Sequence, residues 1–107
     1  MSTYVFINWD FIGYPCFRGG AMSNMQLNPI IVGEVIARYR MKKGITQEVL
    51  SGLSDIGRTH LSAIERGERK PTLETLYRIS VALDIKMSVI VMSIEEEIKK
   101  NDNNKSP

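Results

Sequence analysis

The stretch from Thr46 to Pro71 limits the possible folds of this chain more than any other part of its sequence. Its apolar residues recur about three to five positions apart, so one continuous inner face can form across two short helices. These residues are Val49, Leu50, Leu53, Ile56, Leu61 and Ile64. The predicted outer face carries donors and acceptors with little reason to be buried, namely Arg58, Thr59, His60, Ser62 and Arg66. A short polar and basic helix, braced by a second one, favours insertion into a DNA groove.

Local signals mark the ends of these two helices and of a helix before them. Helices are predicted over residues 31–43, 46–54 and 58–66. Asparagine and threonine side chains cap helix starts, whereas glycine readily adopts the left-handed conformation that ends a helix. The residues concerned are Asn28 and Thr46 at the starts, and Gly44 and Gly67 at the ends.

Two further helices are predicted after Pro71. Thr72 caps a helix over residues 73–83, and Ser88 caps a helix from residue 89 to about 99. Apolar residues at helical spacing predict their buried faces. They are Leu73, Leu76, Ile79 and Leu83 in the first helix, and Met87, Ile90, Val91, Ile94 and Ile98 in the second. Five helices with no confident strand predict an all-α domain.

The composition excludes several classes of protein. The chain has 107 residues, a net charge of +2 and one cysteine, Cys16. A single cysteine excludes an intramolecular disulfide, and with the single histidine it excludes the usual four-ligand zinc site. No apolar run is long enough for a membrane helix, and the first residues lack the basic region of a signal peptide. We therefore expect a cytoplasmic protein with no cofactor, metal or membrane partner.

Basic residues are concentrated in the middle of the chain. Between Ile31 and Lys86 there are ten Lys/Arg and seven Asp/Glu residues. The positive charges form two clusters, which are Arg38, Arg40, Lys42 and Lys43, and Arg66, Arg69 and Lys70. Such clusters are typical of phosphate binding, although solvated helix faces also carry them.

Residues 1–28 differ from the rest of the chain and form a predicted N-terminal extension. They hold six of the eight aromatic residues, and residues 3–12 are β-prone. Two interpretations stay open: a strand-like arm, or a segment outside the functional protein, with Met22 or Met25 as the true start. A DNA-binding domain is predicted over residues 29–100 and a disordered polar tail over residues 101–107.

The spacing within Thr46–Pro71 resembles the helix-turn-helix of the Cro/repressor family, also called the XRE family. The matching residues are Thr46, Gln47, Leu50, Ile56, Leu61, Ser62, Ile64, Glu65, Gly67 and Pro71. The resemblance covers about residues 32–98 and implies a compact five-helix, lambda-repressor-like domain with the motif at helices two and three. The chain also resembles restriction–modification controller proteins. It departs from the family at the turn, where Asp55 replaces glycine, and at Ser51 and Gly57.

The resemblance implies that the helix over residues 58–66 lies in the major groove, with its N-terminal residues toward base edges. The predicted base-reading residues are Arg58, Thr59, His60, Ser62 and Ala63. The predicted phosphate-binding residues are Gln47, Lys43, Arg66, Arg69 and Lys70. Arg58 is the best candidate for reading guanine, although a surface arginine can also bind phosphate without sequence choice. His60 can equally be an exposed helix residue, and Lys43 a helix-capping one.

Two structural roles also follow from the resemblance. In the family a glutamate at the position of Glu65 pairs with an arginine of the first helix, and Arg40 matches that position. The family also binds DNA as two-fold dimers, and the helix over residues 89–99 is the predicted interface. The candidate interface residues are Val89, Ile90, Val91 and Ile94. The alternative is that these residues complete the monomer core; we expect a split, with some facing each way.

Three classes of function compete. The first is a dimeric regulator, such as a repressor, that binds a near-palindromic operator in double-stranded DNA, with its own promoter among the targets. Activation by such a regulator would require contact with RNA polymerase. The second is an antitoxin-like module that binds a toxin partner and autoregulates its operon. The third is an enzyme, which the sequence disfavours because it has no nucleophile–base set, metal cluster or phosphate-binding glycine loop.

Overall fold

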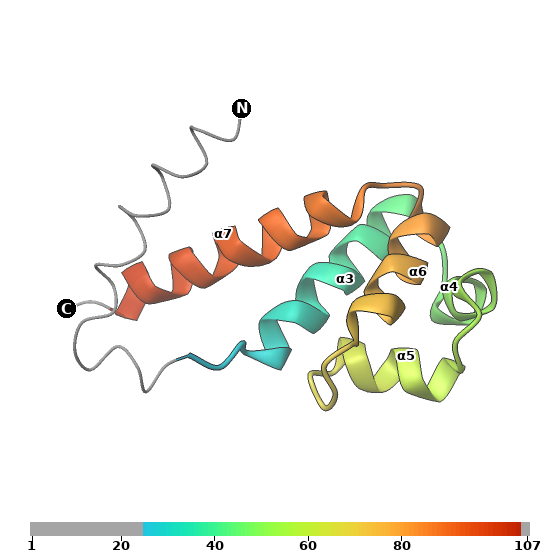
Figure 1. Cartoon of the computed structure of the whole chain (residues 1–107), viewed down its shortest axis with the longest axis horizontal. Coiled ribbons are helices and arrows are strands. Elements are labelled where there is room, and N and C mark those ends of the chain that lie inside the picture. Colours follow the sequence, from blue (N-terminus) through green and yellow to red (C-terminus); the bar gives the residue numbers. More distant parts are fainter. Residues whose placement is uncertain (1–24, 106–107) are drawn as a thin grey trace.

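The computed structural model describes residues 25–105, and side chains up to residue 102. This part of the chain forms five helices and no strand, which confirms the predicted all-α fold (Figure 1). They are α3 (Pro29–Lys43), α4 (Gln47–Ser54), α5 (Arg58–Glu65), α6 (Leu73–Leu83) and α7 (Met87–Lys105). The predicted N-terminal arm lies outside the described residues. None of the described helices is long and apolar enough to cross a membrane.

Capping side chains fix the helix starts as the sequence predicts. Asn28 Oδ1 accepts a hydrogen bond from the N–H of Ile30 at 2.9 Å, so α3 begins two residues before the predicted start. Thr46 and Thr72 accept hydrogen bonds from backbone N–H groups of α4 and α6 in the same way, at 3.1 and 3.0 Å. Gly44 ends α3 with a φ of +78°, in the left-handed region.

The core is formed around α3, which packs on α5, α6 and α7, while α4 packs on α5 and α6. In Figure 1, α7 and α3 run side by side, and the short helices α4 and α5 lie at the opposite end of the molecule from the C-terminal end of α7. Each helix contributes fully buried side chains. They include Val35 and Ile36 of α3, Leu50 of α4, Leu61 and Ile64 of α5, Ile79 of α6 and Ile90 of α7. Burial of this continuous apolar surface drives folding.

Gly33 allows the backbones of α3 and α5 to meet. A Cβ atom at Gly33 would lie 2.3 Å from the carbonyl oxygen of Ile64 and 2.6 Å from that of Glu65. Backbone atoms cannot yield as a flexible side chain can, so no residue larger than glycine fits at this crossing. The end of α5 is thereby held directly against α3.

The predicted inner faces of α4 and α6 are partly wrong. Val49, Leu53 and Leu73 are 45%, 61% and 71% exposed. The buried face of α4 instead includes Ser51 and Ser54, whose hydroxyls donate to carbonyl oxygens of their own helix at 3.1 and 2.6 Å. A small hydroxyl that bonds back to its helix can be buried at little cost, so hydrophobicity alone misplaces the face.

The boundaries predicted for the last helix also need correction. The helix starts at Met87, before the predicted cap Ser88, and continues to Lys105, so the first part of the predicted disordered tail is helical. No glycine or proline occurs between Lys99 and Pro107, and extending an existing helix costs little free energy per residue. Val91, predicted to face inward, is 38% exposed.

Candidate nucleic-acid interface

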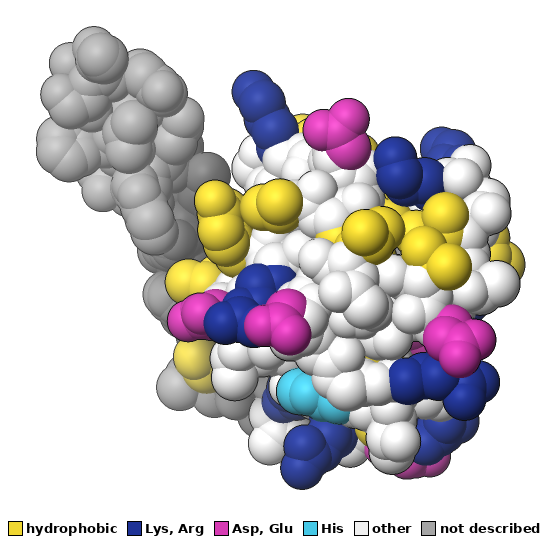
Figure 2. Space-filling view, turned by 90° about the vertical axis from the view of Figure 1, so that its right-hand side faces the viewer, with side chains coloured by type: hydrophobic (Ala, Val, Ile, Leu, Met, Phe, Trp, Pro, Cys, Tyr) yellow, Lys and Arg dark blue, Asp and Glu magenta, His cyan; other side chains and the backbone are white. Residues whose placement is uncertain are grey.

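The five predicted base-reading residues lie along α5. Arg58 and Thr59 are exposed, and His60, Ser62 and Ala63 are partly buried. Figure 2 shows the single histidine of the chain with Lys and Arg side chains near it, on the face formed by the α4–α5 side of the molecule. Gly57, in extended conformation, precedes α5 and supplies no side-chain cap, so the first N–H groups of α5 stay available to water or a ligand.

The turn and the core hold α5 from its inner side. Leu61 and Ile64 are fully buried. Asp55 takes the left-handed conformation that the turn requires, with a φ of +58°, and the N–H of Ile56 donates to Ser51 O at 3.1 Å. A residue other than glycine can therefore occupy the turn, as expected for aspartate. With its inner face fixed, α5 presents its outer face to solvent.

Arg40 and Glu65 join α3 to the C-terminal end of α5. Arg40 Nε lies 2.7 Å from Glu65 Oε2, and Arg40 Nη2 donates to Glu65 Oε1 at 2.9 Å. Arg40 Nη1 also donates to the carbonyl oxygen of Ile45 at 2.9 Å. The two side chains are only 13% and 5% exposed, and the bond with Glu65 raises the pKa of Arg40 above its usual value. The structure thus brings together the two residues of the predicted structural pair.

Gln47, a predicted phosphate-binding residue, takes part in this same network. Its Nε2 donates to Glu65 Oε1 at 3.0 Å. One of its two amide N–H groups is therefore committed within the protein, and only the other is left for a phosphate.

Arg66, another predicted phosphate-binding residue, is held by two neighbours. Its Nε and Nη2 donate to the two carboxylate oxygens of Glu68, both at 2.9 Å, and its Nη1 donates to Ser62 Oγ. The pair with Arg66 lowers the pKa of Glu68, and Glu68 in turn raises the pKa of Arg66. Glu68 was not among the predicted site residues; its position two residues after Arg66 is the signal that the sequence offers for this pair.

The other basic residues predicted to contact DNA are unpaired among the described residues. Within the described part of the chain, no carboxylate forms an ion pair with Arg58, Arg69 or Lys70. All three are exposed, as is Lys43 at the end of α3. Unpaired exposed cations of this kind are the groups that release counterions when they bind phosphates.

The predicted dimer interface is divided by the structure. Ile90 and Ile94 are 0% and 6% exposed and belong to the monomer core, so assigning them to the interface was wrong. They belong to the core cluster because α7 packs on both α3 and α6. Val89 and Val91 are more than a third exposed, as expected for a split. Met92, which was not among the predicted interface residues, is 56% exposed.

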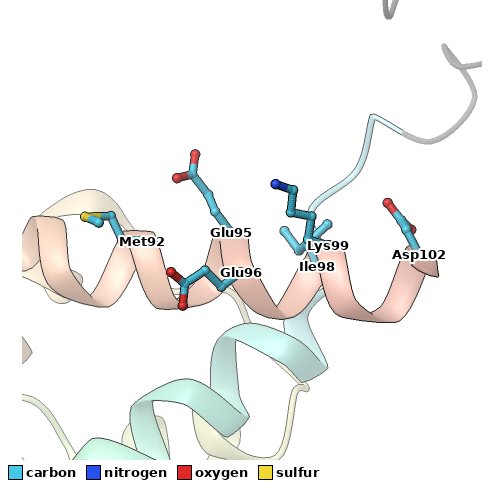
Figure 3. Close-up of a pocket in the computed structure, with 6 residues that line it drawn as sticks. All are labelled: Met92, Glu95, Glu96, Ile98, Lys99 and Asp102. Carbon is cyan, nitrogen blue, oxygen red and sulfur yellow. The ribbon is translucent and has the colours of Figure 1, made fainter. Parts of the chain in front are cut away.

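The outer side of α7 continues beyond Met92 with charged residues. Figure 3 shows Met92, Glu95, Lys99 and Asp102 along one side of α7, pointing away from α3. Ile98, which is partly buried, packs against the core cluster. Among the described residues, no group of three or more His, Cys, Asp or Glu side chains could hold a metal ion.

Comparison with known proteins gives consistent matches. A family model described as helix-turn-helix matches residues 36–90. An uncharacterized HTH-type transcriptional regulator, y4dJ of Sinorhizobium fredii, is 39% identical over 66 residues, which are 62% of this chain and 86% of the relative.

Solved structures of similar fold include two restriction–modification controller proteins. C.AhdI from Aeromonas hydrophila is 29% identical, with a TM-score of 0.58 over 61% of this chain and 98% of that protein. Wild-type C.Esp1396I is 34% identical, with a TM-score of 0.63 over 68% of this chain and 96% of that protein.

Proposed function

Because the chain belongs to the helix-turn-helix family of DNA-binding transcriptional regulators and is not an enzyme, we propose that it regulates transcription as a homodimer. The homodimer binds near-palindromic operators, and one of these lies at its own promoter. Relatives named as restriction–modification controllers support this proposal. Double-stranded DNA is its ligand.

The observation that carries the proposal is the outer face of α5. Arg58 and Thr59 lie exposed in its first turn, while Leu61 and Ile64 anchor the opposite face in the core. A guanidinium without a partner can donate two hydrogen bonds to O6 and N7 of guanine, which discriminates against other bases by about 1–3 kcal/mol. Arg58 is the proposed reader of guanine, and Thr59 the proposed neighbour that contacts a base or a thymine methyl group.

Exposed cations around α5 supply the proposed phosphate contacts. Arg69 and Lys70, in the loop after α5, would bind the DNA backbone, with Lys43 as a flanking contact. Each phosphate neutralised releases a counterion, so these residues set the affinity and its dependence on salt but carry no sequence information.

The proposed dimer forms through α7. Val89, Val91 and Met92 give the first turns of this helix exposed apolar side chains outside the core. Two copies related by a two-fold axis would present two α5 helices to half-sites about 34–36 Å apart, one turn of DNA. Such symmetry explains why a palindromic operator suits a chain that carries one recognition helix.

A gel-shift titration against the DNA upstream of the gene tests this function. We expect Arg58→Ala to relax base preference, and Arg69→Ala to weaken binding to all duplexes alike and to reduce the salt slope by about one. Equal effects of the two substitutions would show that the base-reading residues are misplaced. Normal folding of the wild type without specific binding would refute the regulator proposal.

Analytical ultracentrifugation tests the dimer separately. We expect Val91→Glu to shift the protein toward monomer, because a buried charge would oppose contact between the two α7 helices. Val81→Glu is the matched control, since Val81 is similarly apolar and 59% exposed but lies on α6. Dissociation by both substitutions, or by neither, would contradict the interface on α7.

A further inference from the structure

Arg66 differs from the other cations near α5 because its charge is already paired. Glu68 binds it through both carboxylate oxygens, at 2.9 Å each, and Ser62 accepts a third hydrogen bond. Arg69 and Lys70, a few residues further along, have no such partner among the described side chains. One arginine at this surface is therefore oriented by two partners, while Arg69 and Lys70 carry unpaired charges.

This pairing makes Arg66 poorly suited to bind a phosphate. A guanidinium and a carboxylate in contact carry no net charge, so the pair releases few counterions on binding DNA. A phosphate placed at the guanidinium would also lie close to Glu68 and be repelled by it. The electrostatic reason for assigning Arg66 to the DNA backbone is thus removed by its neighbour.

The same pairing suits Arg66 to directional recognition. A guanidinium has five N–H groups, and three of them are used by Glu68 and Ser62. One N–H group remains on each Nη nitrogen, held in a fixed plane by the contact with Glu68. Two N–H groups on one edge of the guanidinium match the O6 and N7 acceptors of guanine in the major groove, so this match requires that Ser62 accepts from the Nη1 hydrogen on the Cδ side.

We propose that Glu68 is a positioning residue for base recognition, which holds the guanidinium of Arg66 beside Ser62 so that Arg66 reads a guanine edge. This inference rests on the proposed DNA-binding function and deepens it, since it adds a second base-reading arginine at the far end of α5 from Arg58. The spacing supports it: Arg58, Ser62 and Arg66 follow one another at intervals of four residues, so they lie along one side of the helix.

The test compares base preferences by binding a random-sequence library of duplex DNA and sequencing the bound fraction. The variants are Glu68→Ala, Glu68→Gln, Arg66→Lys and the control Glu34→Ala, which removes an exposed carboxylate from α3, outside the proposed DNA and dimer surfaces. Arg66 and Glu68 side chains are 53% and 58% exposed, so these substitutions should leave the protein folded, as a circular dichroism melt would verify.

Glu68→Ala and Arg66→Lys should both lose discrimination at the same base pair of each half-site, by about 10-fold. Glu68→Gln, which retains one acceptor, should fall between wild type and Glu68→Ala. At the same time Glu68→Ala should bind duplexes without the preferred sequence more tightly and with a steeper salt dependence, because a negative charge is removed. Glu34→Ala should keep the wild-type preference.

Two results would overturn the inference. If Glu68→Ala tightens binding to all duplexes by the same factor, Glu68 acts only through its charge. If it weakens binding to all of them equally, its role is structural. A wild-type preference that survives Glu68→Ala would refute this inference alone, whereas a wild type without any preference would refute the proposed function as well.

Discussion

Removing Arg40 should destabilise the domain more than removing any other basic side chain in the described part of the chain. Arg40→Ala would leave the Glu65 carboxylate, 5% exposed, with the Gln47 amide as its remaining side-chain donor among the described residues. The carbonyl oxygen of Ile45 would lose its hydrogen bond from Arg40 as well. An unpaired charge in such a site costs several kcal/mol, because water can hydrate the Glu65 carboxylate only through its small exposed surface.

The size of the effect follows from the burial of the pair. Breaking a buried pair by removing one partner typically costs about 3–5 kcal/mol. Domains of this size are stable by about 5–15 kcal/mol, and each kcal/mol shifts the melting temperature by about 4–8 °C. We therefore expect Arg40→Ala to lower the melting temperature by more than about 10 °C, and Glu65→Ala to act in the same direction.

Thermal and urea unfolding followed by circular dichroism measures these changes. Arg38→Ala is the matched control, because the pair between Arg38 and Glu97 is more exposed, at 49% and 26%, and should contribute less than about 1 kcal/mol. Arg40→Met combined with Glu65→Leu should be less destabilising than the sum of the two alanine variants, since neither charge is then left alone.

A loss of stability in Arg40→Ala no larger than that in Arg38→Ala would refute the proposed contribution of the Arg40–Glu65 pair. A combined variant that lost as much stability as both alanine variants together would refute it as well. Either result would mean that water, rather than the partner side chain, satisfies the charge at this site.

Three further measurements test other parts of the structure. Gly33→Ala should destabilise the domain by about 1–3 kcal/mol or more, because its Cβ meets backbone carbonyls, whereas Gly52→Ala, with open space around it, should stabilise α4 by up to about 1 kcal/mol in urea unfolding. Asp55→Gly should raise the melting temperature slightly, because glycine adopts a positive φ without the strain that a side chain adds. A lower melting temperature would show that the aspartate side chain supports the turn. Because Arg66 lowers the pKa of Glu68, the stabilisation from this pair is present above the ordinary carboxyl pKa and is lost as pH falls through the lowered pKa of Glu68. In an NMR titration, the pKa of Glu68 should rise toward the ordinary carboxyl value in Arg66→Ala.

Local signals in the sequence were sufficient to predict the caps of α3, α4 and α6 but not the boundaries of α7. Asn28, Thr46 and Thr72 cap their helices through bonds that depend only on the next few residues, and Gly44 ends α3 for an equally local reason. Such interactions do not require knowledge of the fold. The family resemblance added the arrangement of the helices, which periodicity alone would have left open.

Burial was harder to predict because it depends on which helices cross. α4 has only two turns, and its buried face carries Ser51 and Ser54 beside Leu50, while Val49 and Leu53 stay exposed. The contact of Gly33 with α5 likewise appears only when two distant segments are packed together. Pairing of surface charges, as in Arg66 with Glu68, has no periodic signal at all.

The attachment of α5 to α3 has a consequence for the DNA. Gly33 brings the two backbones into contact, and the Arg40–Glu65 pair ties the same end of α5 a second time. In the proposed dimer, a recognition helix held so firmly cannot reorient to follow a poorly matched groove, so the duplex has to bend or twist instead. Bending a site of 20–30 base pairs costs on the order of 1–6 kcal/mol and depends on its flexible steps. Base pairs between the half-sites, which no side chain touches, would then contribute to operator choice through their stiffness.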